Sequence, residues 1–371
     1  MAYDIGFLGG GQLARMSIQA AQRMGLRCLS LDPGSDTPAS QIADAVQGRL
    51  DDPSAIAAVL ERCGAVTLEN EFIPAAAISQ AVQRVPDPPR IVPTIETLDR
   101  IQDKYRQRQA YLSAGVPSPR AVTLDRGADE AIAKIGFPMV LKARFGGYDG
   151  KGTRYARNAA EMDQHRALWS HGGWMAEAFV PFRRELAAMV FVTVDGQVGA
   201  FPTMETVQSG HVCDLVFPSG VDASSVAIAA AKAMGGPGLF GVEMFELESG
   251  EILVNEIAPR PHNTGHYTLD WGAVSQFEQH VRLVLGWPVE LKPSGREAAM
   301  ANLLGQPGAN DFRLGIEAAL AEPDVHVHWY GKAETRPGRK LGHINATGPH
   351  AVRKVSEARE RFYRAWTGTH G

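Results

Sequence analysis

Hydrophobic residues along positions 1–93 alternate between short continuous runs and runs spaced as on one face of a helix. The strand-like runs cover residues 5–8, 27–31 and 65–68, and the helix-like runs cover residues 13–24, 53–63 and 74–85. Strands that are separated by helices usually pair in parallel through right-handed crossovers. The pattern therefore predicts a Rossmann-like α/β domain with a parallel sheet.

The pattern changes beyond residue 93, where strands no longer alternate regularly with helices. Helices are predicted at residues 94–114 and 222–234, and strands at residues 139–143, 174–177, 185–194 and 198–201. Residues 241–247 and 251–255 predict a hairpin. This mixture is typical of an α+β domain, whereas the chain from residue 291 onward carries short strand patterns and an ill-defined tail.

The composition excludes several classes of protein. Lys and Arg number 37 against 41 Asp and Glu, a net charge of −4, whereas a general nucleic-acid binder usually carries a basic excess. The three cysteines are too few and too scattered for a disulfide framework, which favours a reducing, cytoplasmic compartment. The N-terminus lacks the features of a signal peptide, and no long apolar run predicts a membrane span.

A glycine-rich turn (GGGQLA, residues 9–14) lies between the first predicted strand and the first predicted helix, and Asp32 ends the next strand. This arrangement fits the dinucleotide-binding fingerprint, in which glycines let backbone N–H groups and a helix N-terminus approach a phosphate. On its own the motif leaves three interpretations open: a dinucleotide site, a turn that serves another ligand, and a turn that serves packing.

A second glycine-rich segment (GGYDGKG, residues 146–152) follows a predicted strand that carries Lys142. Such a loop offers N–H donors and little side-chain bulk, so it can cover a triphosphate while Lys142 supplies a positive charge. It is not a Walker A sequence, because no Gly-Lys-Ser/Thr closes it. A flexible glycine hairpin without a ligand fits the segment equally well.

Two glutamates of the predicted hairpin region are candidate metal ligands. Glu243 and Glu256 lie on adjacent strands in apolar surroundings, so the hairpin can bring both carboxylates to one face. Oxygen ligands of this kind hold Mg²⁺ together with nucleotide phosphates. The alternative is that both glutamates are simply solvated, which is the usual state of an exposed carboxylate.

The loop after Glu256 crowds polar donors among prolines, namely Arg260, His262, Asn263 and His266. An anion-binding loop is better supported here than zinc ligation by the two histidines, because no cysteine or carboxylate completes a set with the usual zinc spacing.

A basic cluster follows near the C-terminus of this acidic chain. Arginine offers a fork for phosphate and lysine a mobile charge, although such a run is often only a solvated loop. The cluster comprises Lys332, Arg336, Arg339, Lys340 and His343.

Taken together, these motifs resemble those of ATP-grasp enzymes, and more closely those of the N5-carboxyaminoimidazole ribonucleotide synthase family, the ATPase subunits of phosphoribosylaminoimidazole carboxylase. The resemblance covers nearly the whole chain and rests on residues 9–13, 146–152, 255–263 and 338–343. It implies an ATP-grasp fold of mixed α/β and α+β class. The expected parts are a Rossmann-like pre-ATP-grasp domain (1–93), the ATP-grasp domain (94–290) and a small β-rich C-terminal domain (291–371).

The resemblance also implies roles for individual residues of this chain. ATP would contact Arg100, Lys142, Gly147, Tyr148, Asp149, Gly150, Lys151, Gly152, Glu177, Ala178, Phe179, Val180, Glu185, Asn255 and Glu256. Mg²⁺ would be held by Glu243 and Glu256. Catalysis would involve Tyr148, Asp149, Arg260 and His262, and these four would also bind substrate together with Gln12, Leu13, Glu69, Lys332, Arg339 and Lys340.

The implied reaction carboxylates 5-aminoimidazole ribonucleotide with bicarbonate, consumes ATP and passes through carboxyphosphate in purine synthesis. The implied protein is a cytoplasmic homodimer without nucleic-acid or membrane partners. One position departs from the family pattern, because Val207 stands where a histidine is expected and His211 follows from a shifted position. The competing hypotheses are an ATP-grasp ligase with another acceptor, a dinucleotide-dependent oxidoreductase built on residues 9–14, and a non-catalytic nucleotide-binding scaffold.

Overall fold

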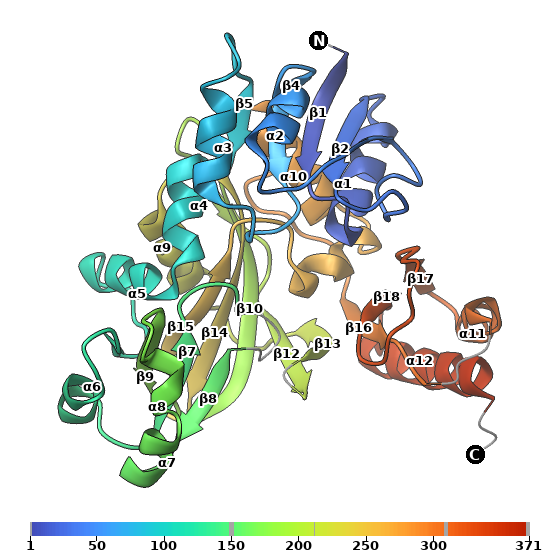
Figure 1. Ribbon diagram of the computed structural model, residues 1–371. Coiled ribbons are helices and arrows are strands. Elements are labelled where there is room, and N and C mark those ends of the chain that lie inside the picture. Colours follow the sequence, from blue (N-terminus) through green and yellow to red (C-terminus); the bar gives the residue numbers. More distant parts are fainter. Residues whose placement is uncertain (1, 148–151, 211, 308–310, 369–371) are drawn as a thin grey trace.

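The computed structural model describes residues 2–147, 152–210, 212–307 and 311–368, and within them the strands form three sheets (Figure 1). The first sheet has five parallel strands in the order β3-β2-β1-β4-β5. Its strands are β1 (Tyr3–Leu8), β2 (Cys28–Asp32), β3 (Asp44–Gln47), β4 (Cys63–Leu68) and β5 (Arg90–Val92). The predicted parallel sheet is thus confirmed, and the short edge strands β3 and β5 are additions.

Helices cover both faces of this sheet, because its central strands bury residues on each side. Leu29 and Leu31 pack with α2 (Pro53–Leu60) and α3 (Ala75–Val82) on one face. Ile5 and Phe7 pack with the helices of the opposite face. These helices are α1 (Gln12–Arg23) and α10 (Gln276–Leu285). The N-terminal sheet is therefore completed by a helix that comes from far along the chain.

The second sheet is small and antiparallel, with the order β6-β9-β7-β8. Its strands are β6 (Ala121–Thr123), β7 (Met139–Ala143), β8 (Thr153–Ala156) and β9 (Trp174–Ala178). The helices of this region are α4 (Ile95–Gln102), α5 (Lys104–Ser113), α6 (Asp129–Lys134), α7 (Ala159–Gln164) and α8 (Arg166–Trp169). Of these, α4 packs on α3, α5 and α9 (Ser224–Met234) rather than on the small sheet. Asp103 separates α4 from α5, since its carboxylate caps the N–H groups of Tyr105 and Arg106.

The third sheet is antiparallel and has nine strands, in the order β15-β14-β10-β12-β13-β16-β18-β17 with β11 paired to β10. Its first six strands are β10 (Phe182–Val192), β11 (Val198–Ala200), β12 (Met204–Ser209), β13 (Val212–Pro218), β14 (Gly238–Leu247) and β15 (Ile252–Ala258). The predicted hairpin is confirmed as the pair β14–β15. The predicted helix is confirmed as α9 (Ser224–Met234), which packs apolar residues against β10 and β14.

The C-terminal strands continue this same sheet, because β13 pairs with the first of them. They are β16 (Ala298–Leu304), β17 (Val325–Trp329) and β18 (Lys340–Thr347), accompanied by α11 (Phe312–Ala319) and α12 (Ala351–Thr367). Helix α12 was not predicted, yet it buries Val355, Phe362 and Trp366 against the sheet. Among the described residues, no helix is both long and apolar enough to cross a membrane.

Candidate active site

A buried carboxylate lies where the small sheet meets the edge of the nine-stranded sheet. Glu177, on β9, accepts hydrogen bonds from Arg108 Nε at 2.7 Å and from Lys142 Nζ at 2.8 Å. Lys142, on β7, also donates to Oδ1 of Asn255, on β15, at 3.1 Å. The structure therefore brings together Lys142, Glu177 and Asn255, which the resemblance had assigned to ATP.

This cluster carries more positive than negative charge. Burial acts to raise the pKa of Glu177, but the positive charges of Arg108 and Lys142 outweigh it and hold the pKa at about 2. Burial lowers the pKa of Lys142, although Glu177 opposes that effect. Two basic side chains thus face one ionised carboxylate, and such a surplus suits a polyanionic ligand.

Carboxylates gather beside this cluster on the β14–β15 hairpin. Glu243 and Glu256 are directly opposite each other in the strand register, so their side chains share a face. Burial, and then the charges of Glu256 and Glu185, raise the pKa of Glu243 to about 7. Burial also acts to raise the pKa of Glu256, but its ion pair with Lys104 holds the pKa below the usual value. A divalent cation would relieve this repulsion between carboxylates.

Arg260 is held by Glu71, which lies in the loop between β4 of the N-terminal sheet and α3. Its guanidinium forms a two-pronged ion pair with Glu71, in which Nη2 donates to Oε1 at 2.8 Å. Nη1 donates to the backbone oxygen of Pro261 at 3.2 Å. Burial acts to lower the pKa of Arg260, but Glu71 and Glu69 raise it above the usual value, so its positive charge is permanent.

His262 lies between Arg260 and the carboxylates. Its ring Nε2 is 3.4 Å from Oε1 of Glu243, and its Nδ1 is 2.9 Å from the hydroxyl of Thr264. Burial, together with the charges of Arg260 and Lys340, lowers the pKa of His262 well below its ordinary value. The imidazole is therefore neutral near pH 7 and is able to accept a proton.

The glycine-rich turn before α1 is filled by a carboxylate. A Cβ added to Gly11 would stand 2.2 Å from Oε1 of Glu69, and that same oxygen accepts the N–H of Leu13 at 3.3 Å. Burial raises the pKa of Glu69. Because Glu69 occupies the place that a pyrophosphate would take at this helix N-terminus, the structure disfavours the dinucleotide interpretation. Gln12 is half-buried as the first residue of α1.

The segment that leads to Lys332 lies beside α1. Tyr330 shares a buried hydrophobic cluster with Leu13 of α1, and the backbone oxygen of Gly331 accepts from Gln41 at 2.7 Å. Lys332 Nζ donates to the backbone oxygen of Lys340 at 2.7 Å. The charge of Lys332 acts on Glu69, and that of Lys340 acts on Glu243 and His262.

Arg339 is held within its own turn, where Nη1 donates to the backbone oxygen of Glu334 at 3.1 Å. Its assigned role at the substrate phosphate stays a prediction.

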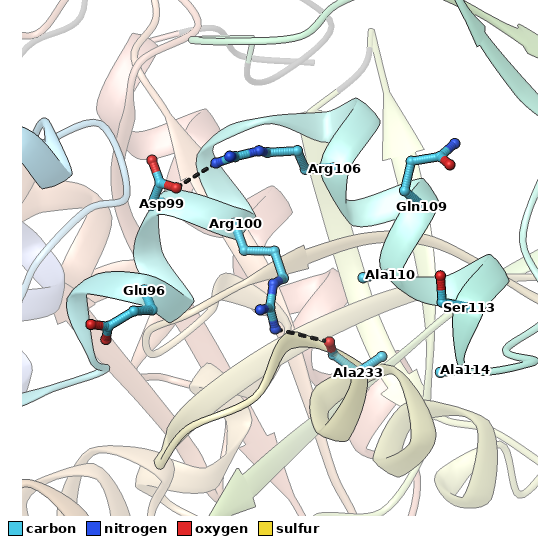
Figure 2. A pocket seen from close by; sticks show the side chains of 9 residues that line it. All are labelled: Glu96, Asp99, Arg100, Arg106, Gln109, Ala110, Ser113, Ala114 and Ala233. Atoms are coloured by element: carbon cyan, nitrogen blue, oxygen red, sulfur yellow. Dashed lines mark hydrogen bonds and ion pairs between the residues drawn. The ribbon is translucent and has the colours of Figure 1, made fainter.

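Arg100 is placed apart from this cluster. Its guanidinium caps the end of α9, where Nη1 donates to the backbone oxygens of Met234 at 2.6 Å and Ala233 at 3.3 Å. It lines a cavity of about 620 Å³ between α4, α5 and α9. Figure 2 shows it there beside the Asp99–Arg106 ion pair. No contact in the described part of the chain joins Arg100 to Lys142, so its role at the ATP phosphates stays a prediction.

Part of the expected nucleotide site lies outside the described residues, namely Tyr148, Asp149, Gly150 and Lys151. The same holds for His211, the histidine expected to follow Val207 from a shifted position. The ends of the glycine-rich loop are described, and the backbone oxygen of Gly152 accepts from Ala143 next to Lys142. Three other residues assigned to ATP lie at the end of β9. Ala178 is its last residue and donates its N–H to the backbone oxygen of Arg120, whereas Phe179 is exposed and Val180 is half-buried. Both carboxylate oxygens of Glu177 are engaged by cations, so its side chain belongs to the cluster.

Three residues that the sequence analysis missed complete these contacts. Arg108 and Lys104 lie on α5, and Glu71 lies in the loop between β4 and α3. Arg108 is 4% exposed although α5 is polar, so the helix pattern gave no reason to expect burial. The sequence signal that could have pointed to Glu71 is its position close to Glu69, another acidic residue.

Comparison with known proteins finds three family models that match successive parts of the chain. Family models match the ribonucleotide synthetase preATP-grasp domain at residues 1–102, the ATP-grasp domain at 109–277 and the phosphoribosylaminoimidazole carboxylase C-terminal domain at 298–357. The phosphoribosylaminoimidazole carboxylase of Ogataea methanolica is 39% identical over 92% of this chain and 66% of its own length. The chain spans about two thirds of the length of the curated relatives that carry this name.

Two further relatives match along nearly their whole length. The N5-carboxyaminoimidazole ribonucleotide synthase of Synechococcus elongatus is 37% identical over 95% of this chain and 92% of its own. The crystal structure of N5-carboxyaminoimidazole synthase from Aspergillus clavatus, in complex with ADP and 5-aminoimidazole ribonucleotide, has a TM-score of 0.87. Its sequence is 30% identical, and the match covers 98% of this chain and 99% of that chain. The chain therefore belongs to the N5-carboxyaminoimidazole ribonucleotide synthase family of ATP-grasp proteins.

Proposed function

We propose that this chain is an ATP-dependent ligase that carboxylates 5-aminoimidazole ribonucleotide with bicarbonate, yielding N5-carboxyaminoimidazole ribonucleotide, ADP and phosphate. The observation that carries the proposal is the continuity of the site. The Lys142 cluster borders the Glu243–Glu256 pair, and the charge of Lys340 acts on both Glu243 and His262. The residues expected to bind the nucleotide therefore adjoin the cations expected to bind the acceptor phosphate. This adjacency is needed if a carboxyl group activated by ATP is to reach a phosphorylated acceptor.

The nucleotide end is suited to hold phosphates and to keep them dry. Lys142 is largely buried and supplies positive charge beside Asn255, and two residues separate the end of its strand from the glycine-rich loop. Carboxyphosphate hydrolyses in water, so a cover made from this loop would protect it. The Aspergillus clavatus relative holds ADP in its crystal structure, which supports a nucleotide at the corresponding site here.

Mg²⁺ fits the residues of the hairpin. The raised pKa of Glu243 reflects burial and repulsion from Glu256 and Glu185, and a divalent ion would offset that repulsion. No group of three potential ligand side chains converges within the described ranges, so phosphate oxygens and water would supply the remaining ligands. When bound, Mg²⁺ would neutralise charge that develops on the transferring phosphoryl group.

The substrate end can bind and orient the acceptor. Lys332 and Lys340 would take the ribonucleotide phosphate, and Arg260 would attract the anionic intermediate that forms on bicarbonate. In the balanced reaction the γ-phosphoryl group passes to a bicarbonate oxygen, and ADP leaves. The amine nitrogen then forms a bond to the carboxyl carbon, phosphate leaves, and the nitrogen loses a proton.

We assign His262 as a candidate to accept that proton. It is neutral near pH 7, and its Nε2 lies 3.4 Å from Oε1 of Glu243, although its lowered pKa makes it a weaker base than an ordinary histidine. Asp149 stays a second candidate, outside the described residues.

The test is ADP release from purified protein with Mg²⁺, measured with and without bicarbonate and 5-aminoimidazole ribonucleotide. We expect fully coupled ADP release when both are present. No ADP formation under those conditions would overturn the proposal. A ligase with another acceptor is the second candidate, for which Lys340→Ala would leave the KM of the true acceptor unchanged. A homodimer in the cytoplasm stays a prediction of the resemblance, and sedimentation would test the dimer.

A further inference from the structure

Asp270 ends the segment that carries the candidate catalytic loop, and it contacts two strands of the C-terminal region. It follows the 3₁₀ helix η1 (Asn263–Leu269), and its side chain is 13% exposed. Its Oδ2 accepts from Nε2 of His328, on β17, at 2.7 Å. The same oxygen accepts from Nδ2 of Asn345, on β18, at 2.6 Å. One carboxylate oxygen thus joins η1 to both strands.

The contacts continue on either side of this carboxylate. Nδ2 of the fully buried Asn345 also donates to the backbone oxygen of His266, within η1, at 3.0 Å. The ring of His328 stacks on that of His343, with 4.5 Å between centroids. Nδ1 of His343 lies 2.9 Å from the hydroxyl of Tyr330. A chain of direct contacts therefore runs from Asp270 to Tyr330, which packs on α1.

The strands that Asp270 holds are those that carry the cations of the substrate end. β17 leads through Tyr330 to Lys332, and β18 begins at Lys340. The hydrogen bond from Lys332 to the backbone of Lys340 links the two positions. The charge of Lys340 acts on His262, the residue that caps η1 at its other end. Asp270 and His262 thus lie at opposite ends of one short helix.

We propose that Asp270 is a positioning residue that sets the distance between the C-terminal cations and the loop of Arg260 and His262. The proposal rests on the proposed function, because it assumes that Lys332 and Lys340 bind the ribonucleotide phosphate. Asp270 is linked to these cations through its hydrogen bonds to His328 of β17 and Asn345 of β18. Its loss should therefore weaken binding of the ribonucleotide and leave the Lys142 end of the site unaffected.

The test compares KM values for 5-aminoimidazole ribonucleotide and for ATP in wild type and in Asp270→Ala. We expect the KM for the ribonucleotide to rise by about ten-fold or more, because two hydrogen bonds to a charged group are lost. The KM for ATP should stay unchanged. Asp214→Ala is the control, since it removes a partly buried carboxylate that binds Arg359 of α12 at 2.6 Å. We expect neither KM to change in that variant.

Two substitutions at His328 keep the proposal testable if Asp270→Ala does not fold. His328→Gln retains a donor toward Asp270 and should keep a low KM for the ribonucleotide, whereas His328→Leu should raise it. An unchanged KM for the ribonucleotide in folded Asp270→Ala, or in His328→Leu, would overturn the proposal, as would a parallel rise in the KM for ATP. Wild-type protein that forms no ADP in response to the ribonucleotide would instead overturn the proposed function.

Discussion

Glu177→Gln removes the charge that holds two buried cations together, and its cost follows from the structure. The pKa of Glu177 falls from 4.5 to about 2 in the folded protein. A difference of this size corresponds to roughly 3 kcal/mol of stability. Breaking a buried ion pair by removing one partner typically costs about 3–5 kcal/mol, which agrees. We therefore expect the free energy of unfolding at pH 7 to fall by about 3 kcal/mol.

The contribution of ionised Glu177 to the free energy of unfolding depends on pH. Because the folded-state pKa of Glu177 is depressed, its stabilisation is fully present above pH 4.5 and is lost as the pH falls toward 2. Urea unfolding at pH 7, followed by circular dichroism, therefore measures the full effect.

Glu130→Gln is the matched control, since it disrupts an exposed ion pair with Lys134. We expect its unfolding curve to overlay that of wild type. If Glu177→Gln were no less stable than this control, the charge of Glu177 would not be what holds Arg108 and Lys142, and our account of the cluster would be wrong.

Three further predictions follow from the same contacts. Lys340→Ala should raise the KM for 5-aminoimidazole ribonucleotide by about ten-fold or more in steady-state assays, because a charged contact to phosphate is lost. The KM for ATP should stay unchanged. Equal changes in both KM values would contradict the assignment of Lys340 to the ribonucleotide phosphate. The folded-state pKa of Glu243 is raised to about 7, so wild type loses stability as the pH rises from 4.5 through 7. Without Mg²⁺, Glu243→Gln should therefore unfold at higher urea than wild type at pH 8, and equal midpoints would refute the reasoning. Gly11→Ala would place a Cβ 2.2 Å from Glu69, and a lower melting temperature by calorimetry should result, whereas an unchanged one would mean that the turn has room.

The parts of the fold that were predictable are those that the chain specifies over a short span. The hairpin β14–β15 and the helix α9 follow from local alternation and periodicity, and both are confirmed. Helix α12 was missed although Val355, Ala358, Phe362 and Trp366 have helical spacing. The packing of α10 on the N-terminal sheet could not be predicted, because it depends on contacts between distant segments.

Site residues that lie next to a sequence motif could be predicted. Site residues that are buried only because they pair with a residue distant in the sequence could not. Lys142, Glu243 and Glu256 stand next to recognisable glycine or apolar runs, and the structure brings them into one region. Arg108, in contrast, lies on a polar helix, and its partner Glu177 is 69 residues away in the sequence. A charged residue of this kind resembles a solvated one until the fold supplies its partner.

The transfer of the γ-phosphoryl group to bicarbonate is tested by following the oxygen atoms of bicarbonate during turnover. Protein is incubated with ATP, Mg²⁺, 5-aminoimidazole ribonucleotide and ¹⁸O-labelled bicarbonate, and the inorganic phosphate is analysed by mass spectrometry. Because the γ-phosphoryl group would be transferred to a bicarbonate oxygen, we predict phosphate that carries one labelled oxygen and that forms in full only when the ribonucleotide is present. Phosphate released without label would contradict the account.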